Sequence, residues 1–301
     1  MVYNLQLDKL FAPKVSSDGI RFKTHVRNTL VERLKSTVDR KDFVSYLLKA
    51  KEAGRGQPYE FPELIAESRS LMVAGERPVG CFNIQNLTNI SGSDTTATQL
   101  AANFFYITQN ADTWEKLRKE IRSTFHDIEE IRLGEALDSC EYLKAVVEET
   151  LRMNASNPGL LPREVLPGGL EIGGEWFPPG IEVGITPYAL HHNPRYYSNP
   201  HEHRPERWLA SDSGSENVTE LYRAFAPFSM GSRMCIGRRF AYTELWITIA
   251  RTVFEYDVKF ISGVREESAG TNANEYKLFD AFASQRDGPF IEFRRKSNPE
   301  A

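Results

Sequence analysis

One stretch near the C-terminal end of this 301-residue chain decides how the rest is interpreted: Phe228-Ser229-Met230-Gly231-Ser232-Arg233-Met234-Cys235-Ile236-Gly237. A helix-like run, Arg238 to Phe254, follows it directly. The N-terminal end of a helix carries partial positive charge and unpaired N–H groups, and both stabilise an ionised sulfur. Most lone cysteines are small buried apolar residues. A cysteine between two glycines and just before a helix instead indicates a ligating or reactive thiolate.

The residues around Cys235 are those of a binding loop. Gly231 and Gly237 can adopt turn conformations and let a flat ligand approach the backbone closely. Arg233 offers a fork of N–H donors for a carboxylate. The stretch fits F-x-x-G-x-R-x-C-x-G and resembles the haem-ligand loop of the cytochrome P450 superfamily, the haem-thiolate monooxygenases. The resemblance implies that Cys235 ligates the iron of haem b, with Phe228, Gly231, Arg233 and Gly237 binding the cofactor.

The composition is that of an ordinary globular protein. Hydrophobic residues make up 41% and charged residues 26%, and 37 basic against 41 acidic residues leave a net charge of −4. This balance excludes the strongly basic surfaces that bind nucleic acid or anionic membranes. The cysteines, Cys81, Cys140 and Cys235, are too few and too scattered for a disulfide framework, which indicates a reducing compartment.

The N-terminal end lacks the pattern of a signal peptide, and no apolar run has the length that spans a bilayer. Eukaryotic members of the resembled family usually begin with a membrane anchor. Two predicted helices between Asp18 and Ala50 resemble helices G and H, in the middle of the family fold. We therefore expect residues 1–301 to form a single N-terminally truncated domain, mainly α with small β-sheets, equivalent to the C-terminal portion of the cytochrome P450 fold.

Two apolar runs, Phe61 to Ala74 and Ala97 to Thr108, resemble the halves of the long helix that covers the haem in this family. Residues 75–91 interrupt them and cannot continue a helix through Pro78 and Gly80. The insertion is either a functional loop or a retained intron. We prefer the intron, because removing the segment restores an unbroken helix and its codons are compatible with splice signals. The sequence of the transcript decides between the two.

Asp94 and Thr95 follow this junction directly. In the resembled family a carboxylate and a hydroxyl at this place relay protons to bound dioxygen, which implies a catalytic role for both residues. Taken alone, they are better explained as a cluster that caps the start of a helix. Together with the cysteine loop, we favour the proton relay over the helix cap.

Glu149 and Arg152 form an E-x-x-R pair on one face of a predicted helix, Ala136 to Met153. Exposed pairs of this kind are common and contribute little to stability. In the resembled family the pair is buried and joined by an arginine from a later P-E-R-W stretch, which corresponds to Arg207 here. The resemblance implies a buried Glu149–Arg152–Arg207 network that holds the cysteine loop against the core.

Short apolar runs between Leu161 and Ile185, separated by glycine and proline turns, predict small β-sheets. Arg163 stands where the family often has a second arginine for a haem propionate. A surface arginine without a role in binding explains this position nearly as well as a propionate-binding arginine does.

Four of the six histidines fall in His191-His192 and His201-Glu202-His203. Alternating histidines can chelate a metal ion, but neither C-x-x-C nor H-E-x-x-H accompanies them. We interpret them as surface and loop histidines.

The resemblance covers nearly the whole chain from about Asp18, with four motifs in the family's order. It implies a fungal-like monooxygenase of secondary metabolism or detoxification, which inserts one atom of O2 into a small hydrophobic organic substrate. Electrons would come from NADPH through a cytochrome P450 reductase, in the cytoplasm or at the cytoplasmic face of the endoplasmic reticulum.

Two alternatives stay open. A truncated or mis-spliced chain would be a catalytically inactive fragment that binds haem poorly or not at all. A haem-binding or interaction module would hold the cofactor without turnover. A carbon monoxide difference spectrum followed by a turnover assay separates the three cases.

Overall fold

The computed structural model describes residues 13–36, 42–49, 58–75, 93–210, 217–261, 274–279 and 284–296. The chain divides at Ser93 into two compact units, and each is described by itself. The insertion expected at residues 75–91 lies, apart from Gly75, outside the described residues.

The N-terminal unit consists of helices α2 (Pro13–Lys35), α3 (Phe43–Lys49) and α4 (Phe61–Gly75). α2 packs against α4, and the buried side chains of this unit include Val26, Leu30 and Leu64. Asp42 precedes α3 and accepts the backbone N–H of Ser45 at 2.9 Å. Its carboxylate also pairs with Arg33 of α2, at 2.6 Å. The two helices predicted between Asp18 and Ala50 are thus confirmed.

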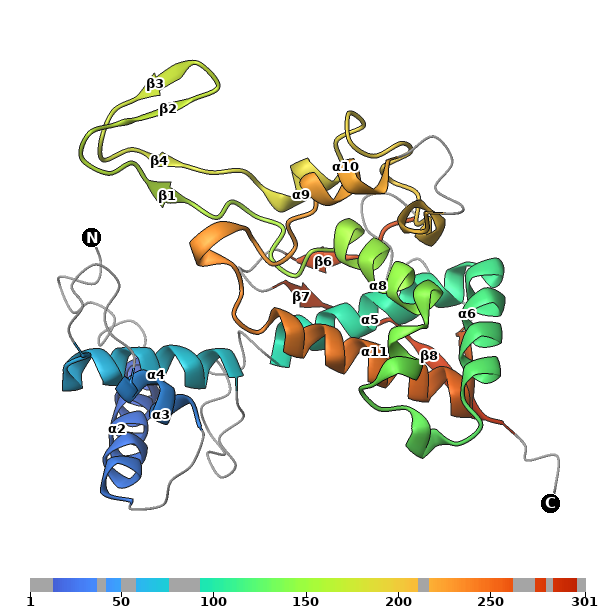
Figure 1. Ribbon diagram of the computed structural model, residues 1–301, viewed down its shortest axis with the longest axis horizontal. Coiled ribbons are helices and arrows are strands. Elements are labelled where there is room, and N and C mark those ends of the chain that lie inside the picture. The colour runs from blue at the N-terminus through green and yellow to red at the C-terminus, as the bar shows by residue number, and fades with distance from the viewer. Residues whose placement is uncertain are drawn as a thin grey trace. The chain divides into compact units, whose positions relative to one another are not determined.

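The second unit is organised around one buried helix, α8 (Glu141–Met153). α8 packs against α6, α9, α11 and the turn η3, and Figure 1 shows it between α6 and the other helices of this unit. The other helices are α5 (Ser93–Gln109), α6 (Ala111–Thr124), α7 (Glu135–Asp138), α9 (Pro187–His191), α10 (Val218–Arg223) and α11 (Arg238–Glu255), with 3-10 turns η2 (Ile128–Glu130), η3 (Pro205–Trp208) and η4 (Gly231–Arg233).

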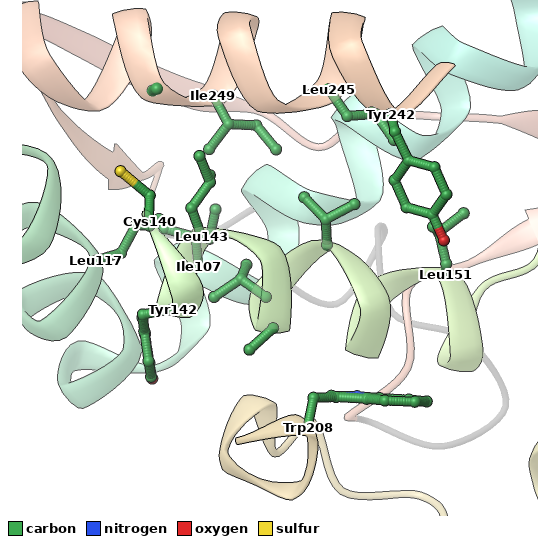
Figure 2. Close-up of a cluster of buried hydrophobic side chains, with 14 of the residues drawn as sticks. Ile107, Leu117, Cys140, Tyr142, Leu143, Leu151, Trp208, Tyr242, Leu245 and Ile249 are labelled. Carbon is green, nitrogen blue, oxygen red and sulfur yellow. The ribbon is translucent and has the colours of Figure 1, made fainter. Parts of the chain in front are cut away.

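The main hydrophobic core forms on two sides of α8. Leu143, Val147 and Leu151 recur at the helical spacing expected for an amphipathic helix, and all three are buried. Figure 2 shows α11 on one side of α8, with Leu245 directed at it, and Trp208 of η3 on the other. The burial of both faces fixes α8 relative to α11 and η3.

The prediction of one helix from Ala136 to Met153 is wrong, because the chain forms α7 and α8 with a break between them. The break has a cause in a neighbouring helix. Glu120 of α6 accepts the backbone N–H groups of Tyr142 and Leu143, both at 2.8 Å. These N–H groups lie in the first turn of α8 and have no partner within a helix. A carboxylate from α6 therefore fixes where α8 begins.

The β structure of the described residues consists of antiparallel pairs: β1 (Arg163–Glu164) with β4 (Glu182–Val183), β2 (Leu170–Ile172) with β3 (Glu175–Phe177), β5 (Tyr256–Phe260) with β8 (Ile291–Arg295), and β6 (Leu278–Phe279) with β7 (Gln285–Arg286). Gly173 and Gly174, with φ of 61° and 87°, make the tight turn between β2 and β3. β1 to β4 extend from the helices as a narrow arm (Figure 1).

Helices with small two-stranded sheets are therefore the architecture of the described residues, as the sequence predicts. Within the same ranges, no helix combines the length and the hydropathy needed to cross a bilayer.

Glu148 ties α8 to α11 by a polar contact at the edge of the core. Its Oε2 accepts a hydrogen bond from the hydroxyl of Tyr242 at 2.8 Å. Burial disfavours the ionised carboxylate and outweighs this hydrogen bond, so the pKa of Glu148 is raised to about 7. The carboxyl group therefore holds its proton in the folded chain at pH values where it has lost it in the unfolded chain.

This difference predicts that stability falls as pH rises from about 4.5 to about 7, because only the folded state binds the proton there. Glu148→Gln cannot titrate, so the variant should lose less stability over that range, by on the order of 2 kcal/mol. Urea unfolding at about pH 5 and about pH 8 measures the effect. Glu244→Gln, at an exposed site on α11, should keep the pH profile of the unmodified chain. Parallel profiles for Glu148→Gln and the unmodified chain would contradict the assignment.

Candidate active site

Backbone hydrogen bonds hold the shape of the cysteine loop. The N–H of Cys235 donates to the carbonyl of Phe228 at 2.8 Å, and that of Met234 to Gly231 at 3.1 Å. Gly231 has a φ of +72°, which glycine adopts at no steric cost. The loop therefore folds back on itself and presents Cys235 just before α11 begins at Arg238.

The thiol of Cys235 is free and exposed. Large apolar side chains flank it along the chain: Ile236 is 77% exposed and Phe240, in the first turn of α11, is 73% exposed. Met230 and Met234 are exposed as well. Contiguous apolar side chains on a surface mark places that a ligand or another surface covers. The exposed thiol thus has large exposed apolar side chains before and after it along the chain.

Other residues of the loop suit a ligand at the sulfur. Gly237 has an ordinary φ of −80°, but a Cβ built on it would lie 3.7 Å from the Sγ of Cys235. Glycine therefore keeps the space beside the sulfur open. Arg233 carries an exposed guanidinium. Phe228 packs its ring against Tyr242 of α11, with 5.2 Å between centroids, and anchors the loop.

Glu149 is the polar centre of the second unit. Its Oε1 accepts hydrogen bonds from Arg152 Nη2 at 2.9 Å, Arg207 Nε at 3.0 Å and the backbone N–H of Arg204 at 3.0 Å. Its Oε2 accepts from Arg152 Nε and from the indole N–H of Trp208, both at 2.9 Å. The side chains of Glu149, Arg152 and Arg207 have no exposed surface. The structure brings together the three residues of the expected network and adds Trp208.

The two guanidiniums also donate hydrogen bonds to backbone carbonyls at the end of α9 and in the segment that follows it. Arg152 Nη1 donates to the carbonyls of His191 at 2.9 Å and Pro200 at 2.7 Å. Arg207 Nη1 donates to the carbonyl of Ser198 at 3.1 Å. The network therefore fixes this segment as well as the pairing of α8 with η3.

The ionisation of Glu149 depends on its partners. Burial alone would raise its pKa, but the guanidiniums of Arg152 and Arg207 outweigh burial and lower the pKa of Glu149 to about 2. Burial likewise opposes the charge of Arg152, and Glu149 outweighs it, so the pKa of Arg152 is raised. Each buried charge is stable because its partner is present.

His191 connects the network to the cysteine loop, and the sequence interpretation missed this residue. Its Nε2 accepts the backbone N–H of Ala226 at 3.0 Å, so the neutral ring carries its proton on Nδ1, which donates to the carbonyl of Arg152 at 3.1 Å. Burial, with the nearby Arg152, lowers the pKa of His191 to about 3 and keeps the ring neutral. Ala226 closely precedes Phe228, whose carbonyl holds Cys235.

The interpretation of the remaining histidines as surface and loop residues is correct for their place in loops and wrong for the exposure of His192. His192 is buried, and the ring of His203 stacks on Tyr106 of α5 with 4.4 Å between centroids. The side chain of His201, in contrast, is about half exposed. No local pattern in the sequence distinguishes these cases, because distant helices and loops cover the rings.

Asp94 and Thr95 lie in the first turn of α5 and are half-buried. The carbonyl of Thr95 accepts the hydroxyl of Ser156 at 3.0 Å, which anchors the start of α5 to the segment after α8. Arg163 is exposed in β1, and its Nη1 donates to the carbonyl of Pro162 at 2.8 Å. Its guanidinium is therefore engaged by its own segment.

Removing one member of the network should destabilise the chain strongly. Arg207→Ala leaves Glu149 buried with one cation fewer, and we expect the free energy of unfolding to fall by about 3–5 kcal/mol. Urea unfolding followed by circular dichroism measures this loss. The matched control is Arg223→Ala, which breaks an exposed pair with Glu220 and should cost less than about 1 kcal/mol. A loss for Arg207→Ala no larger than that of the control would show that the network contributes little.

Comparisons with known proteins place the chain in one family. The family model described as Cytochrome P450 matches residues 86–274. The structure resembles the crystal structure of the cytochrome P450DA heme domain, with a TM-score of 0.65 and 16% sequence identity, over 91% of this chain and 53% of that one. At this identity the likeness concerns the fold.

Three fungal relatives give the sequence evidence. The chain is 34% identical to the cytochrome P450 monooxygenase apf7 of Gibberella fujikuroi over 97% of this chain and 54% of that protein. It is 35% identical to the cytochrome P450 monooxygenase poxM of Penicillium oxalicum, over 95% of this chain and 51% of that protein. It is 34% identical to the cytochrome P450 monooxygenase apf8 of Gibberella fujikuroi, over 96% of this chain and 75% of that protein. The chain thus spans about half the length of the first two relatives. It belongs to the cytochrome P450 family.

Proposed function

We propose that this chain is the haem-binding portion of a fungal monooxygenase of secondary metabolism or detoxification, which inserts one atom of O2 into a small organic substrate. One observation carries the proposal. The thiol of Cys235 is exposed in a segment with several large exposed apolar side chains, and the carbonyl of Phe228 and the N–H of Ala226 in the same loop are both hydrogen-bonded.

The residues at this surface fit a haem b ligated by Cys235. The sulfur is free, Gly237 leaves the space beside it open, and the exposed apolar side chains of Ile236 and Phe240 suit the face of a porphyrin. A haem with a cysteine thiolate ligand supplies oxygen activation, because the thiolate pushes electron density onto the iron and favours O–O cleavage.

Individual side chains would then have distinct tasks. The exposed guanidinium of Arg233 would bind a propionate of the cofactor, and Arg163 is a second candidate once it leaves the carbonyl of Pro162. Phe228, Gly231 and Gly237 would shape the loop that presents Cys235 to the cofactor.

Asp94 and Thr95 are proposed as proton carriers. A carboxylate can take a proton from solvent and pass it to the hydroxyl of Thr95, which both donates and accepts. Both residues lie in the first turn of α5 and are half-buried. The bond from Ser156 to the carbonyl of Thr95 keeps this turn fixed while protons move.

The network of Glu149, Arg152 and Arg207 would act on the site by positioning. It donates hydrogen bonds to the carbonyls of His191 and Ser198. His191 in turn accepts the backbone N–H of Ala226, two residues before the start of the cysteine loop. None of these residues needs to touch the cofactor for its loss to move the sulfur.

The wider setting follows from the family. We infer an NADPH-dependent cytochrome P450 reductase as electron donor, a small hydrophobic substrate, and a place in the cytoplasm or at the cytoplasmic face of the endoplasmic reticulum. Residues 1–301 would form one domain, with residues 75–91 as an insertion between α4 and α5. The ends of both helices at that junction, Gly75 and Ser93, are consistent with this.

The experiment is a carbon monoxide difference spectrum of the full chain reconstituted with haem b. We expect the strongly red-shifted Soret band of thiolate ligation in the unmodified chain, and its loss in Cys235→Ser. Cys140→Ser is the matched control, because Cys140 is buried away from the loop in the main core, and this variant should keep the band. An ordinary Soret band in the unmodified chain, or a red-shifted band in Cys235→Ser, would overturn the proposal.

Turnover is measured next, with NADPH, a reductase and a panel of small hydrophobic compounds. Product that contains one atom of labelled O2 supports the monooxygenase. A chain with the red-shifted band and no product would instead be a haem-binding module.

A further inference from the structure

Three side chains from separate parts of the sequence meet beside the network, outside the site described above. They are His192, which follows α9, His201 in the next loop, and Glu275 before β6. One donor atom from each lies within 4.8 Å of the other two. His201 Nδ1 is 2.6 Å from Glu275 Oε1, and His192 Nε2 is 3.9 Å from the same oxygen.

His192 has the form of a pre-arranged ligand. The residue is only 8% exposed, and its ring stacks on Tyr188 with 4.1 Å between centroids. Nδ1 lies 2.9 Å from the carbonyl of Tyr188, so it carries the proton and donates. Nε2 is then unprotonated, buried, and without a hydrogen bond to any described residue. Ligating histidines typically have this arrangement, with one nitrogen tied to a carbonyl and the other turned to the metal.

Glu275 supplies the anionic donor. It is 7% exposed, and its Oε2 accepts the hydroxyl of Tyr188 at 3.2 Å, so Oε1 is the oxygen that faces both imidazoles. The hydrogen bond from Tyr188 orients the carboxylate in the way that outer-shell partners orient metal ligands. The same tyrosine therefore holds two of the three donors.

We propose that His192, His201 and Glu275 bind a divalent transition-metal ion of the Zn2+ class. Two imidazoles and one carboxylate are ligands that zinc accepts, and they do not suit Ca2+ or Mg2+, which prefer oxygen donors. A tetrahedral site with metal–donor distances of about 2.1 Å has donor atoms about 3.4 Å apart. The present separations of 2.6 Å and 3.9 Å bracket that value. The fourth position is left for water.

The ion would have a structural role. The loop between His192 and His201 carries the carbonyls of Ser198 and Pro200 that receive Arg207 and Arg152. A metal bound at both ends of this loop, and to Glu275, would hold those carbonyls in place. Binding should therefore stabilise the folded chain in proportion to the logarithm of the free metal concentration.

The test uses the full chain, free of any affinity tag and stripped with a chelator, titrated with Zn2+ by calorimetry and with Co2+ by absorption spectroscopy. We expect one ion per chain, the visible bands of tetrahedral Co2+, and a rise in the unfolding temperature with Zn2+. Mg2+ and Ca2+ should give none of these. His192→Ala and His201→Ala should each weaken zinc binding by at least about tenfold.

Two controls keep the test decisive. His126→Ala removes an exposed histidine elsewhere on the chain and should leave the dissociation constant unchanged. Glu275→Gln keeps the shape of the side chain, so it should fold and still bind zinc weakly. If the chain shows no saturable binding, or if His192→Ala binds as the unmodified chain does, the three residues form only an ion pair between His201 and Glu275, and the proposal is wrong.

Discussion

The buried carboxylate of Glu149 is the interaction on which the rest of the second unit depends. It receives donors from Arg152, Arg207, Arg204 and Trp208, in α8 and in η3. Taking such charges out of water costs several kcal/mol each, and only complete pairing offsets that cost. The carboxylate therefore admits one arrangement of α8 and η3, because any other would leave a buried charge without its partner.

The constraint reaches the candidate active site through ordinary hydrogen bonds. Arg152 and His191 exchange two of them, each donating to the carbonyl of the other. The other nitrogen of His191 holds Ala226, and the loop then closes on itself between Phe228 and Cys235. An exposed sulfur, on a loop with little apolar burial of its own, is in this way tied to the most buried part of the unit. These hydrogen bonds connect a site on the surface to the core.

The sequence predicts the parts of the molecule whose cause is local. Helical spacing identifies most helices, and the motifs around Cys235, Glu149 and Arg207 identify the residues that the structure joins in one network. The errors have non-local causes. The break before α8 is set by Glu120 of another helix, and the burial of His191 by segments far from it in the chain. Glu275 approaches His201 only in the folded state, so no pattern along the sequence indicates their meeting.

The most direct measurement of the central claim is a double-mutant cycle between Glu149 and Arg207. Unfolding free energies are determined for the unmodified chain, Glu149→Gln, Arg207→Gln and the double variant. Residues of one buried ion pair should couple, and we predict an interaction energy of about 2–3 kcal/mol, so that the double variant loses less stability than the sum of the two single losses. Additive losses, within about 0.5 kcal/mol, would mean that the two side chains act independently and that the carboxylate does not hold the unit together.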